Sequence, residues 1–228
     1  MKPLHSLKTN TDVFAGIRMN VIGDSITHGT YTAPGDIGPA SVTDKPWCIL
    51  LGEQLGFSNV NNYGISGISI SSTTDVNPLH AISSEYATMS DEANLILVAG
   101  GTNDYGTCVK LGTTEDAEDV SFYGGLHVLC KGLRKKYPHA VIVFITPINR
   151  TDEAENENGN TLDQYRRAIY DVASGVYGFS VIDGSTLGFT DDMDTYLSDG
   201  VHPTPDGHRL FADAVAKLLV PILSKASR

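Results

Sequence analysis

Two runs of consecutive apolar residues, Leu95–Ala99 and Val141–Ile145, constrain the fold of this chain more than any other feature. Both runs are short and bounded by polar or glycine-containing segments, which favours strands over helices. A strand without polar residues must be covered on both faces, as in parallel sheets whose crossover helices pack on each side. The two runs therefore predict central strands of a parallel sheet that lies between two layers of helices.

Strand-like and helix-like segments alternate along the rest of the chain. Apolar and β-branched runs predict strands at residues 18–22, 59–62, 95–99, 140–145 and 180–182, and segments of helical period predict helices at residues 47–55, 122–137, 163–177 and 206–225. In the last helix the apolar residues recur every three or four positions, and Asp206 stands where an N-cap is expected, after Pro205. This alternation predicts right-handed βαβ crossovers and an α/β fold.

Length and charge narrow the class of protein. The chain of 228 residues is long enough for one α/β domain and short for two, so we expect a single domain over residues 1–228, with residues 1–17 as an N-terminal extension. It carries 16 basic and 27 acidic residues, a net charge of −11. This acidic balance disfavours nucleic acid or an anionic membrane as a partner, because both require a cationic face.

Cysteine content and the N-terminal segment bear on the compartment. The three cysteines, Cys48, Cys108 and Cys130, are an odd number without metal-site spacing, so neither a disulfide framework nor a zinc cluster is predicted. Residues 1–17 lack the apolar stretch of a signal peptide, and no segment reaches the roughly 18 apolar residues of a membrane span. The sequence predicts a cytoplasmic protein, although a secreted protein whose signal has been removed would read the same. It leaves the oligomeric state open.

Polar and glycine-rich segments follow each predicted strand. Ligands of open parallel sheets bind at the carboxyl ends of the strands, so these segments are the candidates for a site. They contain no dinucleotide-binding Gly-x-Gly-x-x-Gly, no phosphate-binding loop with its lysine, no Gly-x-Ser-x-Gly elbow and no His-x-x-x-His zinc pair. We therefore predict no cofactor.

A serine, a histidine and an aspartate among these segments can act together. Gly23-Asp24-Ser25 ends the first strand and places the Ser25 hydroxyl at the sheet edge. Serine is a poor nucleophile until a base accepts its proton. His202 can be that base, because Asp199, three residues earlier, can accept its imidazole N–H within one loop. In the alternative interpretation Ser25 is only a helix N-cap. Asp24 is interpreted as structural.

A second histidine, His208, lies in the first turn of the last predicted helix, where a packing role is more common than a second base. A metal site formed by Asp199, His202, Asp206 and His208 is an alternative. No outer residues that would orient such ligands can be identified, so we predict no metal.

Acyl transfer through a serine also requires N–H donors aimed at the developing oxyanion. Gly67 can present a backbone N–H with no Cβ in the way of a substrate, and Asn103 can present a side-chain amide. Either signal is weak alone. Together with Ser25, Asp199 and His202, they place a nucleophile, an acid–base pair and two donors on one edge of one sheet.

The segments that contain Ser25, Gly67, Asn103 and the pair Asp199 and His202 follow one another in this order along the chain. In this order they resemble the four blocks of the SGNH, or GDSL-type, hydrolase family, named for serine, glycine, asparagine and histidine. The resemblance implies a three-layer α/β/α sandwich of the flavodoxin type with a five-stranded parallel sheet. It implies Ser25 as nucleophile, His202 as base and Asp199 as the partner of the base. The oxyanion hole would comprise the backbone N–H groups of Ser25 and Gly67 and the side chain of Asn103. The matching segments are residues 23–27, 62–67, 101–104 and 199–204, within a resemblance from about residue 18 to 220.

Gly64 also lies in the second block, and Gly67 is favoured because it closes the family's Asn-x-x-x-x-Gly spacing from Asn62. The implied activity is that of a serine esterase that hydrolyses carboxylic esters through an acyl-serine intermediate. The implied partner is a small-molecule or saccharide ester.

The site loops are polar and no broad hydrophobic lid is visible, which favours short acyl groups such as acetyl esters on carbohydrates. His28, Tyr31 and Tyr105 are predicted to bind substrate, and the long loop at residues 27–46 is a further candidate wall. Four alternatives stay open. They are a lipolytic lysophospholipase or thioesterase, an acyltransferase, a metal-dependent hydrolase, and a non-catalytic carbohydrate-binding module on the same fold.

Overall fold

A computed structural model describes residues 14–32, 40–72 and 80–226 of the chain. Five strands form one sheet in the order β4-β1-β5-β6-β7, and every neighbouring pair is parallel. All five predicted strands are confirmed, with ends that differ by no more than two residues. The strands are β1 (Arg18–Gly23), β4 (Asn59–Gly64), β5 (Leu95–Ala99), β6 (Val141–Ile145) and β7 (Ser180–Ile182).

The strand order determines where a ligand can bind. Numbered along the chain, the five strands lie in the order 2-1-3-4-5, which is the flavodoxin type. After β1 the chain passes to β4 on one side and then to β5 on the other. The carboxyl ends of β1 and β5 therefore flank the switch point, where ligands bind in such folds. The predicted five-stranded parallel α/β fold is confirmed.

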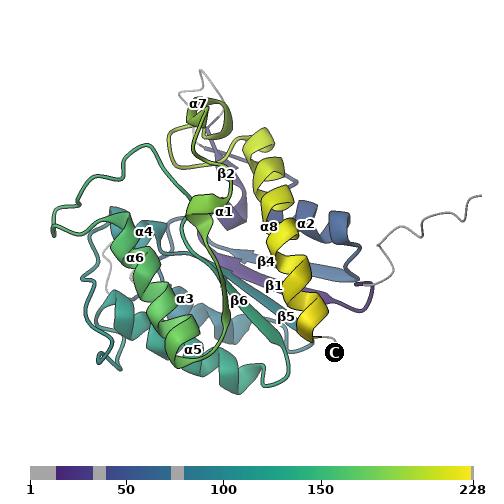
Figure 1. The fold of residues 1–228 in the computed structure, drawn as a ribbon, viewed down its shortest axis with the longest axis horizontal. Coiled ribbons are helices and arrows are strands. Elements are labelled where there is room, and N and C mark those ends of the chain that lie inside the picture. Colours follow the sequence, from purple (N-terminus) through teal and green to yellow (C-terminus); the bar gives the residue numbers. More distant parts are fainter. Residues whose placement is uncertain (1–13, 33–39, 73–79, 227–228) are drawn as a thin grey trace, which may run out of the picture.

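Helices cover both faces of the sheet (Figure 1). On one face α2 (Trp47–Leu55) and α8 (Pro205–Ala226) pack together, and on the other lie α3 (Ile82–Glu85), α5 (Phe122–Lys136) and α6 (Leu162–Ile169). This arrangement explains why Leu95–Ala99 and Val141–Ile145 are continuously apolar. Because side chains alternate along a strand, Leu95 and Leu97 face the first helix layer while Ile96 and Val98 face the second.

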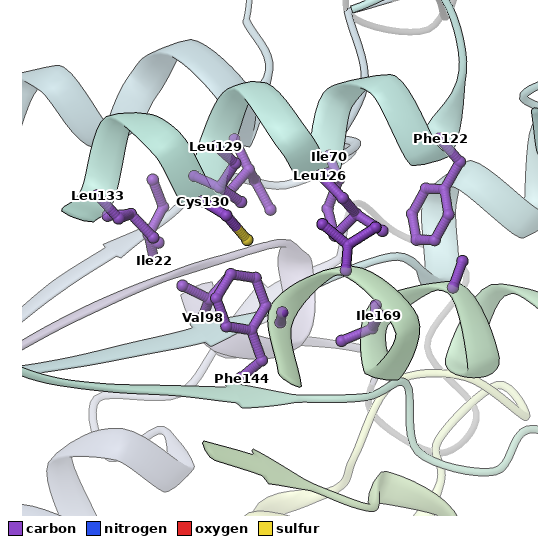
Figure 2. Packing of buried hydrophobic residues seen from close by; sticks show 14 of the residues in the cluster. Ile22, Ile70, Val98, Phe122, Leu126, Leu129, Cys130, Leu133, Phe144 and Ile169 are labelled. Atoms are coloured by element: carbon purple, nitrogen blue, oxygen red, sulfur yellow. The ribbon is translucent and has the colours of Figure 1, made fainter. Parts of the chain in front are cut away.

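The core beneath α5 shows how a helical period produces a buried face. Leu126, Leu129, Cys130 and Leu133 recur at steps of three and four residues and are all fully buried. Figure 2 shows these side chains pointing from α5 towards the sheet, where Val98 and other apolar side chains meet them.

Two helix predictions require correction. The helix predicted over residues 163–177 consists of α6 followed by a π-helical segment, Tyr170–Val176. Asp206 is not the N-cap of the last helix, which begins one residue earlier, at Pro205. Thr204 precedes that helix, and its hydroxyl accepts a hydrogen bond from the Gly207 N–H at 3.1 Å. Asp206 pairs instead with Arg209 one turn on.

Several short elements in the segments after the strands were not predicted. Some of them carry candidate site residues, among them Ser25 and Asn103. Parts of two predictions, residues 33–39 of the loop at 27–46 and residues 1–13 of the N-terminal extension, lie outside the described residues. No helix in the described ranges is long and apolar enough to cross a membrane. The short elements are α1 (Ser25–His28), β2 (Thr30–Tyr31), β3 (Ser41–Val42), α4 (Thr102–Gly106), α7 (Met193–Tyr196) and the 3₁₀ turns Tyr86–Thr88 and Gly184–Thr186.

Candidate active site

Ser25 is the first residue of α1, directly after β1. The cap of this short helix is Asp24, whose carboxylate accepts the Ile26 N–H at 2.9 Å. The alternative interpretation of Ser25 as an N-cap is therefore wrong. Gly23 lets β1 end close to β5, because a Cβ at this position would lie 2.3 Å from the carbonyl oxygen of Ala99. The Ser25 hydroxyl is thereby placed at the carboxyl edge of the sheet, beside the switch point.

The Asp-His loop, residues 198–203, brings Asp199 and His202 to this serine. The Ser25 Oγ lies 2.8 Å from the His202 Nε2, and the His202 Nδ1 lies 2.7 Å from the Asp199 Oδ2. The other carboxylate oxygen of Asp199 accepts the backbone N–H groups of Val201 at 3.0 Å and His202 at 2.8 Å. The structure thus joins the three predicted residues in one hydrogen-bonded series.

The charge on Asp199 determines what the imidazole can do. Partial burial acts to raise the pKa of this carboxyl, but hydrogen bonds from the backbone and ring of His202 outweigh it and hold the pKa below the usual value. An ionised Asp199 keeps the ring proton on Nδ1 and leaves Nε2 free to accept the serine proton. The arrangement can therefore act as a general base towards Ser25.

A glycine holds the Asp-His loop against the body of the protein. Gly200 has φ +82°, in the left-handed region that favours glycine. A Cβ at this position would lie 2.1 Å from the Thr151 Oγ1, and the Thr151 N–H donates to the Gly200 carbonyl at 2.9 Å. Only glycine fits this contact without movement of a neighbour.

The glycine loop, residues 65–71, follows β4 on the other side of Ser25 in the sheet order. Its first four residues form a turn closed by the Ile68 N–H on the Ile65 carbonyl at 3.2 Å. Gly67 occupies the third position of this turn with φ +77°, as a type II turn requires. The Asn103 amide donates to the Ile68 carbonyl at 2.8 Å, and the same amide carries a second N–H. The two predicted oxyanion donors thus lie on segments that are bonded to each other.

Gly64, the other glycine of the second block, has a different reason to be glycine. A Cβ on Gly64 would lie 2.3 Å from the backbone nitrogen of His28, so this position allows β4 to pack directly against α1. Gly67, not Gly64, stands in the loop beyond the strand end.

Comparison with known proteins agrees with this geometry. The sequence model of the GDSL-like lipase/acylhydrolase family matches residues 21–210. The chain belongs to this family. By membership of this family it is a carboxylic ester hydrolase. No curated protein sequence matches the chain with significant similarity.

Solved structures of GDSL-like hydrolases and similar proteins share the fold over nearly the whole chain. A protein from Lactobacillus plantarum is 27% identical with a TM-score of 0.75, and the match covers 91% of this chain and 98% of that one. An aryl esterase from M. smegmatis is 22% identical with a TM-score of 0.66, over 90% and 99% of the two chains. A family two carbohydrate esterase from Clostridium thermocellum is 17% identical with a TM-score of 0.65, over 92% of this chain and 65% of that one.

Of the three residues predicted to bind substrate in this GDSL-like hydrolase, His28 contacts the glycine loop, with its Nδ1 3.4 Å from the Ser66 Oγ. Its Nδ1 is 3.0 Å from the Thr30 hydroxyl, which in turn lies 2.7 Å from the hydroxyl of Ser66, next to Gly67. His28 also follows Ser25 by three positions on α1, so the two side chains share a face of that helix. A polar network therefore borders the predicted oxyanion donors.

The two predicted tyrosines lie in different surroundings. Tyr31, in β2, lines an open groove together with Leu50 and Pro205. Tyr105 is only 5% exposed, and its hydroxyl donates to the backbone carbonyls of residues 152 and 154. It packs edge-to-face on Tyr165 in the core. The structure therefore does not bring Tyr105 to the Ser25 surface.

Asp104 is the residue that sequence reasoning passed over. Its carboxylate is fully buried and accepts the N–H groups of Ile70 at 2.8 Å and Ser71 at 3.0 Å. Burial raises the pKa of Asp104 to about 7 in spite of these two bonds, and burial likewise raises the pKa of Asp24 to about 6. The signal was present in the sequence, since Asp104 follows Asn103 directly, but nothing there indicated its partners.

The four residues of the metal alternative are distributed over different contacts. His202 and Asp199 bond to each other, and Asp206 pairs with Arg209. His208 is fully buried, and its Nδ1 accepts the Trp47 N–H at 3.3 Å. This agrees with a packing role, although its Nε2 has no partner among the described residues. Within the same ranges, no three His, Cys, Asp or Glu side chains are grouped to hold a metal ion.

Proposed function

We propose that this chain is a serine esterase that hydrolyses short-chain carboxylic esters, with acetylated carbohydrates as favoured substrates, through an acyl-serine intermediate. The observation that carries the proposal is the series Ser25 Oγ to His202 Nε2 at 2.8 Å and His202 Nδ1 to Asp199 Oδ2 at 2.7 Å. An acyl-enzyme mechanism requires such a base beside the hydroxyl, because an isolated serine is a poor nucleophile.

In the acylation step, the His202 Nε2 takes the proton of the Ser25 hydroxyl while Oγ attacks the ester carbonyl carbon. Negative charge develops on the carbonyl oxygen, which the Ser25 and Gly67 N–H groups and the Asn103 amide would stabilise. The tetrahedral intermediate then breaks its bond to the alcohol oxygen, which leaves with the proton from His202. Asp199 stabilises the imidazolium between the two transfers.

Deacylation repeats these steps with water. A water molecule gives a proton to the His202 Nε2, and its oxygen attacks the acyl carbon of the ester on Ser25. The second oxyanion occupies the same donors. Its collapse breaks the bond to the Ser25 Oγ, which recovers the proton from His202, and the carboxylic acid is released. Each turnover consumes one ester and one water.

The surroundings of the site support a small or polar ester. The network of His28, Thr30 and Ser66 borders the glycine loop with hydroxyl and imidazole groups, which suit the hydroxyls of a sugar. The large apolar side chains that are exposed in the described ranges lie on separate elements, and they are Val42, Val120, Val176 and Leu218. Two structural neighbours carry the names aryl esterase and carbohydrate esterase, in agreement with this choice.

The test compares wild type with Ser25→Ala on aryl esters of increasing acyl length and on acetylated saccharides. We expect turnover to be highest with acetyl esters and to fall by about 10⁴-fold or more in Ser25→Ala, since the nucleophile is lost. A fluorophosphonate should label wild type at Ser25 and leave the variant unlabelled. Ser58→Ala is a matched control, because Ser58 precedes β4 at the opposite edge of the sheet and should leave turnover unchanged.

Other outcomes identify the alternatives. Near-wild-type turnover by a folded Ser25→Ala would overturn the serine mechanism, and loss of activity with a chelator would favour a metal-dependent hydrolase. Preference for long acyl chains would indicate a lysophospholipase or thioesterase. Faster transfer of the acetyl group to an added alcohol than to water would indicate an acyltransferase. Saccharide binding without any turnover would indicate a binding module.

A further inference from the structure

The first turn of α4 holds the glycine loop by two consecutive side chains. The Asn103 amide donates to the Ile68 carbonyl at 2.8 Å. The Asp104 carboxylate accepts the Ile70 N–H at 2.8 Å on one oxygen and the Ser71 N–H at 3.0 Å on the other. One helical turn therefore presents the candidate oxyanion amide and also fixes the loop that carries the second candidate donor.

The opposite end of the glycine loop is fixed to the strand that leads to the nucleophile. The Ile65 N–H donates to the carbonyl of Gly23 at 3.0 Å, two residues before Ser25. The turn at Gly67 lies between this bond and the bonds to α4. Both ends of the short span around Gly67 are thus attached to segments that carry the other candidate donors.

Burial shows how specific the Asp104 contact is. Asp104 has no solvent exposure, and a buried carboxyl is unfavourable unless its oxygens are hydrogen-bonded. Both oxygens accept backbone N–H groups from the same loop, so the side chain fits this position in one orientation. An amide in its place would keep one acceptor and turn an NH₂ group towards the second N–H.

We propose that Asp104 is a positioning residue, which sets the location of the Gly67 N–H relative to the Asn103 amide by binding the Ile70 and Ser71 N–H groups. The inference rests on the proposed esterase function, because it concerns the oxyanion donors of that reaction. Asp104 acts through the glycine loop and does not touch the substrate. Its loss displaces a donor that interacts most strongly with the transition state, so it lowers kcat and leaves KM near the wild-type value.

The experiment is the variant Asp104→Asn, assayed with an aryl acetate at a temperature below the unfolding midpoint of the variant. We expect kcat to fall by about 10- to 100-fold, the range that follows from misplacement by up to an ångström. Affinity for a phenylboronic acid, which forms a tetrahedral adduct with the serine, should fall in parallel. Asp119→Asn is the matched control. Asp119 accepts the next N–H along the chain, that of Ser72 at 3.0 Å, and the hydroxyls of Ser71 at 2.8 Å and Ser83 at 2.6 Å. It holds neither of the N–H groups that Asp104 holds, so this variant should lose stability while kcat and boronate affinity stay unchanged.

Each remaining outcome decides the question. A folded Asp104→Asn with wild-type kcat would overturn the proposal, and so would equal losses of kcat in the two variants. If Asp104→Asn does not fold, Asp104→Glu, which keeps the charge and moves the oxygens by one methylene, replaces it with the same expectation. Failure of both to fold would replace positioning with a general structural role. Failure of the esterase proposal itself would appear separately, as activity that persists in Ser25→Ala.

Discussion

The Asp-His loop and the glycine loop supply the two halves of the proposed site, and they are built differently. The Asp-His loop is stabilised mainly from within, because Asp199 bonds to the backbone and the ring of a residue only three positions away. The glycine loop is stabilised from distant parts of the chain, by Gly23 and by the turn that carries Asn103 and the buried Asp104. The acid–base unit is thus a local motif, while the oxyanion unit depends on tertiary packing. Substitutions on the two sides should therefore differ in how strongly activity and stability change together.

The largest effect in this comparison is expected on the glycine-loop side, from Asn103→Ala. Loss of an oxyanion donor should lower kcat by about 10²–10³-fold. Because the Ile68 carbonyl also loses its donor, the free energy of unfolding should fall by about 1 kcal/mol. Steady-state kinetics measure the change in kcat, and denaturant unfolding measures the change in the free energy of unfolding. Asn59→Ala, at the other end of β4, is the control. A cost confined to KM would mean that Asn103 only binds substrate.

The same contrast explains which parts of the site could be predicted from sequence. Asp199 and His202 lie within one loop, so their pairing was visible in their spacing. The central strands β5 and β6 were visible because continuous apolar runs indicate burial on both faces of a sheet. The partners of Asp104 were not visible, since they lie more than 30 positions away and bond through their backbones.

The misplacement of Tyr105 has a geometric cause. Residues 102–106 read as a loop after a strand, whereas they form the helix α4. Two helical positions differ by about 200° around the axis, so Tyr105 points away from the side on which Asn103 meets the glycine loop. The prediction for Tyr105 was wrong because no pattern in the sequence indicates so short a helix.

A second prediction uses pH to compare the two regions. Desolvation by burial lowers the pKa of His208, in the first turn of α8 behind the Asp-His loop, to about 4 from 6.5. The unfolded chain therefore binds this proton more tightly, and the contribution of His208 to the free energy of unfolding should fall as pH falls from about 6.5 to 4. The loss is at most about 3 kcal/mol. The contribution of Asp104 to the free energy of unfolding changes with pH in the opposite direction. Its raised pKa gives a contribution that is complete below 3.8 and lost as pH rises to about 7.

His208→Asn separates the two contributions. An asparagine oxygen can keep the acceptor that the Trp47 N–H requires, but it cannot titrate. Urea unfolding between pH 4 and 7 should show that the variant loses less stability in acid than wild type does. The exposed His139 provides the control variant His139→Asn, whose profile should follow wild type. If the free energy of unfolding changed with pH in the same way in His208→Asn and wild type, the predicted loss of stability in acid would not come from His208.

The smallest effect is expected from Gly200→Ala, which tests how far a loop stabilised from within can adjust. Alanine at φ +82° costs about 1 kcal/mol in the left-handed region, and its Cβ must displace the Thr151 hydroxyl. Because the bonds between Asp199 and His202 lie within the loop, we expect it to shift as a unit, with a loss in kcat of about tenfold and an unfolding midpoint lowered only by this backbone cost, about 2–4 °C.

The double variant Thr151→Ala with Gly200→Ala removes the hydroxyl that the new Cβ would meet, so it should recover part of the lost kcat. Equal activity of the single and double variants would place the whole cost in the backbone conformation. A loss of kcat as large as that of Asn103→Ala, accompanied by a fall in the unfolding midpoint larger than the backbone cost explains, would show that the Asp-His loop depends on tertiary packing as much as the glycine loop does. The two halves of the site would then share one mode of support, and the contrast between a local acid–base unit and a packed oxyanion unit would fail.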